Sequence, residues 1–255
     1  MVFLFFMTDA TFWNPEIYGA NARFVADLGE PLLLLLEPKV GDLILDLGCG
    51  DGALTKKIAA SGAKVIGVDS SYEQMRASKQ HGLRGLVMDG QALCFKACFD
   101  AVFTNAALHW MKQPLHAAIG VRNALRSGGR FIGEFGGKAN VEVIRKALHE
   151  GLRRRDIDPW SVDPWYFPST DEYAQLLAQV GFTVDYIELV PRPTKLPGDI
   201  LGWLEVFAQP FTNAIPPAAR PAFLDEVRHQ LKPTLLDADG RWEADYVRLR
   251  FKAHK

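Results

Sequence analysis

The stretch LILDLGCGDGAL, residues 43–54, constrains the fold more than any other part of the sequence. An apolar run reaches Asp46 and Leu47, and glycines follow at positions 48, 50 and 52. An apolar strand that enters a glycine-rich turn and then a helix is typical of the first unit of an α/β domain. Glycines also let a ligand approach the backbone closely, because they carry no side chain. We therefore expect a ligand site at this turn.

Strand and helix patterns alternate from residue 42 to residue 136. Apolar runs predict strands, and segments bounded by serine starts and glycine stops predict helices. The predicted strands are residues 42–48, 64–69, 85–90, 99–105 and 130–136, and the predicted helices are residues 53–62, 70–82 and 114–129. Alternation at this spacing indicates parallel strands with helices on both faces of the sheet.

The second half of the chain is less regular. Its pattern predicts helices at 140–155 and 170–181, a loop rich in proline and aromatic residues at 156–169, a strand at 182–194, broken helices over 199–232 and a last strand at 242–253. The total of 255 residues suits one large α/β domain, or one domain with a substantial insertion. We expect a single domain, 1–255.

Charge and cysteine content exclude several classes of protein. The chain has 29 Lys and Arg against 30 Asp and Glu, which argues against a protein that holds nucleic acid mainly by charge. Cys49, Cys94 and Cys98 form no CxxC pair, so we expect a reducing, cytoplasmic compartment and no metal site. The apolar segments 1–7 and 31–38 lack the features of a signal peptide or the length of a membrane span.

The glycine turn is compatible with two kinds of ligand. Gly48, Gly50 and Ala53 fit the dinucleotide pattern G-x-G-x-x-G/A, so an NAD enzyme is one reading. Asp46 argues against it, because a dinucleotide places an anionic pyrophosphate on this turn. S-adenosyl-L-methionine has no phosphate and carries a sulfonium and an α-ammonium, both cationic. A carboxylate beside the turn attracts such a ligand, directly or through water.

Two further acids follow later strands. Asp69 ends the second predicted strand, where a carboxylate can accept both hydroxyls of a ribose, although NAD enzymes use an acid in the same way. Asp89 follows the third, from where it can accept the amino group of an adenine, although Asp-Gly is also common turn chemistry. Acids after three strands form a row at the carboxyl edge of the sheet, where ligands of open α/β sheets bind.

At these residues the sequence resembles class I S-adenosylmethionine-dependent methyltransferases. The matching segments are LDLGCGDG (45–52), VIGVDSS (65–71), VMDGQAL (87–93) and FDAVFTNAALHWM (99–111). The resemblance implies a doubly wound, seven-stranded, mostly parallel sheet, with an antiparallel strand from 243–253 in the last-but-one position. It further implies a cofactor-binding core at 41–135, an N-terminal helical cap at 1–40 and a helical lid at 195–235.

The same resemblance assigns the cofactor site residue by residue. Asp46, Gly48, Cys49 and Gly50 form the turn around the methionine part, and Asp69 holds the ribose. Ser70 lies beside the adenine, Asp89 and Gly90 meet its edge with Gln91 close by, and Asn105 and Ala106 approach the methionine moiety.

The N-terminal FWNPEIYGANARF and the run NAALHWM resemble the trans-aconitate methyltransferase type among small-molecule methyltransferases. This resemblance implies that Trp13 and Tyr18 close the cofactor site. Both are alternatively core-packing residues of an N-terminal helix.

For the acceptor we expect an apolar pocket walled by Trp110, Trp203, Phe207 and Phe211, unless these aromatic residues only pack the lid on the core. The expected reaction is methyl transfer to a small carboxylate or hydroxyl, by a monomer or homodimer without nucleic-acid or membrane partners. A carboxylate needs no base. A hydroxyl or amine does, and His109 is then the first candidate, although a capping or packing role suits it as well. Nucleic-acid or protein methylation, or cofactor binding without activity, remain alternatives.

Overall fold

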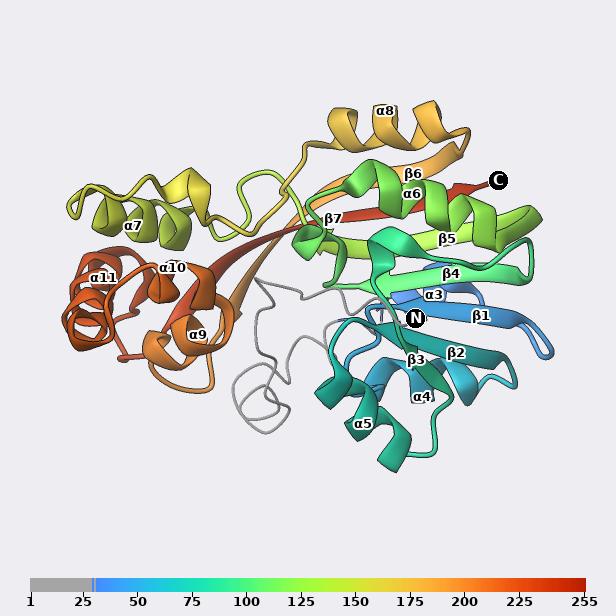
Figure 1. Cartoon of the computed structure of the whole chain (residues 1–255), viewed down its shortest axis with the longest axis horizontal. Coiled ribbons are helices and arrows are strands. Elements are labelled where there is room, and N and C mark those ends of the chain that lie inside the picture. The colour runs from blue at the N-terminus through green and yellow to red at the C-terminus, as the bar shows by residue number, and fades with distance from the viewer. Residues whose placement is uncertain (1–28, 30) are drawn as a thin grey trace, which may run out of the picture.

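Seven strands form one sheet in the order β3-β2-β1-β4-β5-β7-β6 (Figure 1). The computed structural model describes residue 29 and residues 31–255. Strands β1 to β5 pair in parallel, and β7 pairs antiparallel with both β5 and β6. The predicted fold, with one antiparallel strand in the last-but-one position, is therefore confirmed. The strands are β1 (Leu43–Leu47), β2 (Lys64–Asp69), β3 (Gly85–Val87), β4 (Phe99–Asn105), β5 (Leu125–Gly136), β6 (Thr183–Lys195) and β7 (Glu243–His254).

Helices cover both faces of the sheet. On one face, β-strand residues such as Phe131 and Phe251 pack with α6 and α8, and on the other, Ile44 and Phe103 pack with α3 and α4. The described helices are α3 (Pro31–Leu36), α4 (Ala53–Ala59), α5 (Tyr72–Gln80), α6 (Pro114–Ala124), α7 (Glu142–Arg153), α8 (Thr170–Val180), α9 (Ile200–Phe207), α10 (Gln209–Asn213) and α11 (Arg220–Leu235), with short 3₁₀ turns η1 (Gly90–Ala92), η2 (Leu108–Trp110), η3 (Pro159–Ser161) and η4 (Pro217–Ala219).

A second core lies beside the sheet. Helices α7, α9, α10 and α11 gather at the left of Figure 1, around buried residues that include Leu148, Trp203 and Phe223. Strand β7 joins the two cores, since Ala244 and Tyr246 belong to the helical core and later residues of the strand to the sheet core. The region 195–235 is therefore helical, as expected, and it is fixed to the sheet through β7.

One predicted helix is shorter than expected. Residues 114–129 were predicted as one helix, but α6 ends at Ala124 and β5 begins at Leu125, which pairs with Phe99 of β4. Gly128 then takes a left-handed conformation, with φ of 74°, and donates its N–H to the carbonyl of Lys255. Strand pairing and the glycine turn outweigh the helix propensity of this segment.

The prolines of β6 have a positional explanation. Pro191 and Pro193 lie within the strand and still pair in register with β7. Strand β6 is the edge of the sheet, so the missing proline N–H groups leave no neighbouring strand without a partner.

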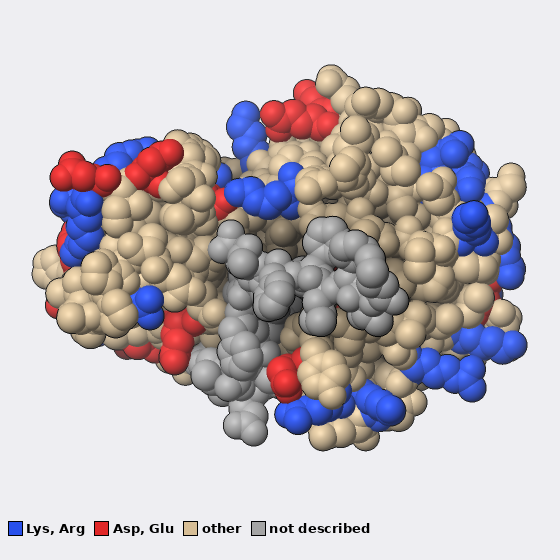
Figure 2. All heavy atoms as spheres, in the orientation of Figure 1, with Lys and Arg blue, Asp and Glu red and all other residues tan. Residues whose placement is uncertain are grey.

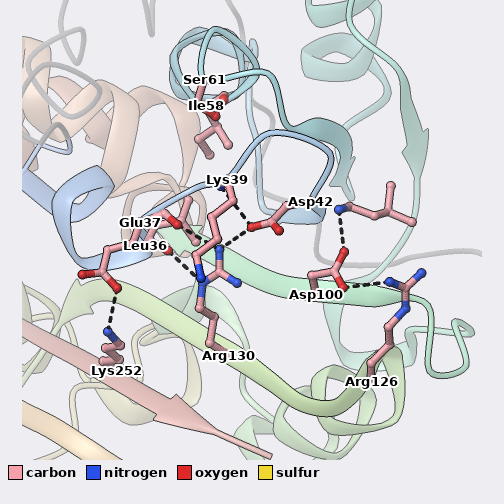
Figure 3. Close-up of polar contacts among 11 residues, drawn as sticks. Leu36, Glu37, Lys39, Asp42, Ile58, Ser61, Asp100, Arg126, Arg130 and Lys252 are labelled. Atoms are coloured by element: carbon pink, nitrogen blue, oxygen red, sulfur yellow. Dashed lines mark hydrogen bonds and ion pairs between the residues drawn. The ribbon is translucent and has the colours of Figure 1, made fainter.

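Charged groups fasten the amino edge of the sheet (Figure 3). Arg130 of β5 donates Nε–H to the carbonyl of Leu36 at 2.8 Å and pairs with Asp42 at 2.6 Å. Asp100 of β4 accepts from the backbone N–H of Leu43 at 2.8 Å and from Arg126 at 2.7 Å. These bonds fix β1, β4 and β5 relative to one another, so that their carboxyl ends meet at the opposite edge.

In the part of the chain that the structure describes, no helix is long and apolar enough to cross a membrane. The same residues contain no group of three or more His, Cys, Asp or Glu side chains placed to hold a metal ion.

Candidate active site

A cavity of about 770 Å³ opens at the carboxyl edge of the sheet. Its strand half is lined by residues at the ends of β1 to β4, such as Gly50, Asp69 and Asp89. Its helical half is lined by η2, the loop at 156–169, α9 and the start of β7.

The three glycines of the turn have two different structural roles. All three have left-handed φ angles: 73° at Gly48, 55° at Gly50 and 83° at Gly52. A Cβ at Gly48 would lie 2.2 Å from the Cβ of Ala107, and one at Gly52 would lie 2.0 Å from the side chain of Leu83. A Cβ at Gly50 would meet nothing within 4 Å. Gly48 and Gly52 therefore permit packing, whereas Gly50 keeps the cavity floor open.

Asp69 connects the glycine turn to α5. Its Oδ2 accepts from the N–H of Gly50 at 3.0 Å, and its Oδ1 accepts from the N–H of Ser71 at 2.9 Å. Burial raises the pKa of Asp69, although these N–H groups act in the opposite direction. Each carboxylate oxygen can accept a further hydrogen bond, so Asp69 can hold the turn and bind ligand hydroxyls together.

Asp46 does not line the cavity. Its carboxylate is 2% exposed and accepts from the hydroxyl of Thr55 on α4 at 2.6 Å. Burial is the main reason that the pKa of Asp46 is raised to about 7, and the negative charge of Asp69 adds to the effect. Asp46 therefore lies behind the turn, and its predicted attraction for a cation would act without direct contact in this structure.

Cys49 also points away from the cavity. Its Sγ lies 3.5 Å from the sulfur of Met75, and a Cβ at Gly67 would lie 2.7 Å from Sγ. Burial raises the pKa of the Cys49 thiol, and nearby carboxylates raise it further. The side chain fills the space between the turn and β2, so only the backbone of this residue belongs to the turn.

The other predicted residues of the strand half lie together. Asp89 caps η1, where its Oδ1 accepts from the N–H of Gln91 at 2.9 Å. Ala106 has a left-handed φ of 56°, and its N–H donates to the carbonyl of Glu134 at 2.7 Å. Backbone strain of this kind concentrates at functional sites. Among the predicted residues, those that line the cavity here are Gly48, Gly50, Asp69, Ser70, Asp89, Gly90, Gln91, Asn105 and Ala106.

The predicted aromatic wall needs one correction. Trp110, Trp203 and Phe207 line the helical half, but Phe211 does not. The ring of Phe211 is fully buried, with its centroid 5.1 Å from that of Trp165 and 5.8 Å from that of His149. Because α10 begins after Phe207, Phe211 turns into the helical core instead of the cavity.

The sequence did not identify several other residues of the helical half, and six of them bear on the chemistry of the site. Each lines the cavity, and they lie in segments with no recognisable motif: Lys112, Asp163, Trp165, Phe167, Tyr246 and Arg248. The density of aromatic residues in the loop 156–169 was the available signal for Trp165 and Phe167. Nothing in the alternation of the last strand distinguishes Tyr246 or Arg248 from its other residues.

Asp163 organises the loop at 156–169. Its Oδ2 accepts from Arg145 at 2.6 Å and from His149 at 2.8 Å, and its Oδ1 accepts from the N–H of Trp165 at 3.0 Å. Burial would raise the pKa of Asp163, but bonds from His149, Trp165 and Arg145 outweigh it and leave the pKa below its usual range. The Asp163 carbonyl also accepts from Lys112. The loop is therefore anchored to α7.

His109 is held as a neutral ring. Its Nδ1 accepts from the backbone N–H of Gly136 at 3.2 Å, so the ring proton resides on Nε2. Burial, and secondly the positive charge of Arg248, keep the pKa of His109 well below its ordinary value. If Nδ1 were protonated, its N–H would point at the backbone N–H of Gly136, and the two donors would repel each other. This geometry opposes a role as general base.

Arg248 and Tyr246 form the cationic corner of the helical half. The Arg248 guanidinium lies 4.6 Å from the centre of the Tyr246 ring, and the residue as a whole is 7% exposed. The Tyr246 hydroxyl accepts from the indole N–H of Trp203 at 2.6 Å. Burial raises the pKa of Tyr246 to about 12. The corner therefore presents a fixed positive charge among buried rings.

Trp13 and Tyr18, expected to close the cofactor site, lie outside the described residues, as does most of the expected N-terminal cap. The described part of that cap, α3, packs on the sheet with Leu32 and Leu36 and forms no part of the cavity wall.

Known proteins resemble this chain in sequence and in fold. Residues 45–133 match the methyltransferase domain family. An uncharacterized methyltransferase of Schizosaccharomyces pombe is 37% identical over 96% of this chain and 98% of its own. A trans-aconitate 2-methyltransferase of Mycolicibacterium gilvum is 30% identical over 92% of this chain and 93% of its own. The solved phosphoethanolamine N-methyltransferase 2 of Haemonchus contortus, in complex with phosphomonomethylethanolamine and S-adenosylhomocysteine, superposes with a TM-score of 0.59 at 17% identity, covering 94% of this chain and 56% of that chain.

The matched domain contains the glycine turn, Asp69 and Asp89 of the strand half, and two relatives align over nearly the whole chain. S-adenosyl-L-methionine is accordingly the cofactor, in place of NAD. The chain belongs to the class I S-adenosylmethionine-dependent methyltransferases.

Proposed function

We propose that this methyltransferase transfers the methyl group of S-adenosylmethionine to an oxygen of a small organic carboxylate. The observation that carries the proposal is Arg248, a buried cation in the wall of the helical half. A guanidinium binds a carboxylate through two parallel N–H bonds and is lightly hydrated, so it suits a buried anion site.

The side chains around Arg248 favour an acceptor that needs no base. His109 is neutral, with Nδ1 engaged by Gly136. Asp163 accepts three hydrogen bonds, and bonding to it leaves its pKa below the usual range, which makes it a weak base. A hydroxyl or amine must lose a proton during methylation, whereas a carboxylate is ionised at neutral pH. The surroundings therefore favour a carboxylate over the hydroxyl alternative.

The reaction balances without proton transfer. A lone pair of the carboxylate oxygen forms the new bond to the methyl carbon, and the carbon–sulfur bond breaks with its electron pair going to sulfur. The products are a neutral methyl ester and a neutral thioether. The sulfonium supplies the electrophile, and this chain contributes position and the exclusion of water.

The residues of the two halves have separate tasks. In the strand half, Gly50 leaves space for the cofactor, and Asp69 has acceptor capacity for its ribose hydroxyls. In the helical half, Arg248 orients the acceptor, and the surrounding rings keep water from the reacting atoms. A helical region 195–235 that closes over the site would serve the same purpose.

The relatives and the surface agree with a small acceptor. The Mycolicibacterium gilvum relative is named for trans-aconitate, which is a small carboxylic acid. On the face shown in Figure 2, basic and acidic side chains are mixed at the left, and the mostly basic side chains along the right and lower edge are separated by uncharged surface, so no continuous basic stripe of described residues crosses the face. A nucleic-acid substrate would call for such a stripe.

The proposal is tested by incubating the protein with labelled S-adenosylmethionine and three panels of acceptors: small carboxylic acids, phenols and amines. We expect alkali-labile methyl esters from the acids and no methylated phenols or amines. Arg248→Leu should lower kcat/KM for the best acid roughly 10- to 150-fold, as expected for a lost charge-assisted bond of about 1.5–3 kcal/mol. Arg76→Leu is the control, because Arg76 pairs only with Glu73 on the exposed face of α5. A methylated phenol or amine without ester would overturn the proposal.

A further inference from the structure

We infer that the acceptor is a monocarboxylic acid with a flat apolar body, either aromatic or conjugated, and not a compact polycarboxylate. The inference rests on the proposed function, because it specifies the acid that the helical half takes. Two observations carry it: the composition of the cavity wall and the balance of charge in that wall.

Aromatic rings dominate the wall of the helical half. They come from four segments that are distant in the sequence: η2, the loop at 156–169, α9 and β7. These rings line the cavity and also belong to the helical core or pack against it. These residues are Trp110, Trp165, Phe167, Trp203, Phe207 and Tyr246.

The rings touch one another and form a continuous surface. Trp165 is at the centre: its ring stacks on Phe167, with centroids 5.6 Å apart and an interplanar angle of 19°. Trp110 and Trp203 lie at its sides, with centroids 6.1 Å and 6.3 Å from that of Trp165. Phe207 continues the surface from Trp203 at 5.0 Å. Such a wall contacts a flat apolar body through stacking and edge-to-face geometry.

The charged groups of this half allow one anionic group on the ligand. The described wall of the helical half carries two cationic side chains, Arg248 and Lys112, against one carboxylate, so it has one positive charge in excess. The buried Asp163 carboxylate lies in the same wall. A tricarboxylate would place its second and third carboxylates against rings, near Asp163 or beside uncharged polar side chains such as Asn140 and Asn213, none of which supplies a balancing charge. Burying a carboxylate without a partner costs several kcal/mol.

Contacts within the wall also fix the position of Arg248 relative to the rings of Tyr246 and Trp203. The Arg248 guanidinium lies over the Tyr246 ring, and the Tyr246 hydroxyl is bonded to the indole of Trp203. Guanidinium groups commonly pack on aromatic faces, and this contact holds the charge of Arg248 against the Tyr246 ring. A carboxylate bound to Arg248 is therefore placed at the border of the aromatic wall, and the body attached to it extends along the rings.

The test compares acids of matched size as methyl acceptors of the full-length protein: a phenylpropenoic acid, its saturated cyclohexyl counterpart and trans-aconitic acid. Ester formation is measured by mass spectrometry, with kcat/KM for each acid. We expect the conjugated aryl acid to exceed trans-aconitic acid at least tenfold, and the cyclohexyl acid to lie between them. A tricarboxylate that reacts equally well or better overturns the inference while leaving the proposed function intact. Absence of ester from every acid, with methylation of phenols or amines, overturns the proposed function itself.

Variants of Trp165 identify the wall as the cause. Trp165→Leu should lower the ratio of kcat/KM for the aryl acid over the cyclohexyl acid about tenfold, in line with roughly 1–1.5 kcal/mol for an aromatic pair. The ratio is informative even if the variant is less stable, and Trp165→Phe should restore most of it. Trp160→Leu is the matched control, because Trp160 is 59% exposed and lies over Arg145 outside the cavity wall. An unchanged ratio in Trp165→Leu, with the fold intact, contradicts the assignment.

Discussion

The strand half and the helical half of the cavity are built in opposite ways. In the strand half, each lining segment directly follows a strand. The shape of the wall there depends mainly on backbone conformation, as at the left-handed residues Gly50 and Ala106. In the helical half, side chains from η2, a loop, α9 and β7 meet only because two cores pack together. The strand half, our proposed cofactor site, is therefore formed by local segments that short motifs predict, whereas the helical half, our proposed acceptor site, depends on tertiary packing.

The largest expected effect comes from comparing alanine substitutions at two glycines of the turn, Gly48 and Gly50. Gly48→Ala should destabilise the fold by about 2–5 kcal/mol, because left-handed backbone strain adds to the clash with Ala107. Gly50→Ala carries the strain alone, about 1–2 kcal/mol, but its methyl group enters the cavity. Urea unfolding and calorimetry with S-adenosylhomocysteine separate the two effects. Equal losses of stability in both variants would contradict the division of roles.

The next effect concerns the charge at the end of β2. Asp69→Asn keeps the size of the side chain but removes its charge, and S-adenosylhomocysteine should bind roughly 10- to 150-fold more weakly, matching about 1.5–3 kcal/mol. Asp69→Ala should lose more, since it also frees the N–H groups of Gly50 and Ser71. Calorimetry at one pH measures both variants. An unchanged dissociation constant in Asp69→Asn would remove the ribose assignment.

A smaller effect is expected when pH changes the ionisation of Asp46, because both stability and cofactor affinity should then change. Because its folded-state pKa is raised to about 7, the protein without ligand should lose stability as the pH rises from about 4 to about 7. A cationic ligand favours the ionised form, so cofactor affinity should change in the other direction and fall about tenfold from pH 8 to pH 6. The comparison variant is Asp46→Asn, in which both dependences should flatten. If the wild-type affinity is already flat over this range, Asp46 does not sense the ligand charge.

The smallest effect is expected at His109, in the helical half. His109→Gln preserves an acceptor for the N–H of Gly136, so kcat for an acid should fall less than tenfold. The rate of the wild-type protein should also be independent of His109 ionisation between pH 6 and pH 8, because the pKa of His109 is well below its ordinary value. A loss of 100-fold or more, which is typical when a general base is removed, would restore the base hypothesis.

The sequence was sufficient for most of the fold because strand ends and turns leave local signals. The strands at 64–69 and 99–105 were predicted with the bounds that the structure shows. The end of α6 was missed, because the pairing of Leu125 with Phe99 is a long-range contact that overrides a helical pattern. The periodicity of a segment indicates its local preference for helix or strand. Pairing with a neighbouring strand can override that preference in the folded protein.

The site divides in the same manner. Motifs placed Asp69 and Gly50 in the cavity wall, but they gave no information on side-chain direction, so Asp46 and Cys49 were expected in the wall and face away from it. Arg248 and Asp163 were missed because their neighbours in space are remote in the sequence. Only the packing of the helical core on β7 shows that they share a cavity with the glycine turn.

The position of β7 between β5 and β6 has a consequence for synthesis of the chain on the ribosome. The strands of the strand half are complete once residue 105 has emerged, but β5 and β6 have no common neighbour until residues 243–254 follow. Until then the nascent chain exposes the edge of β5, a 12-residue strand, which invites pairing with other chains. Insertion of β7 completes the sheet and, in the same event, brings Arg248 to the cavity. A chain that carries the proposed acceptor site is thus one whose sheet is already complete.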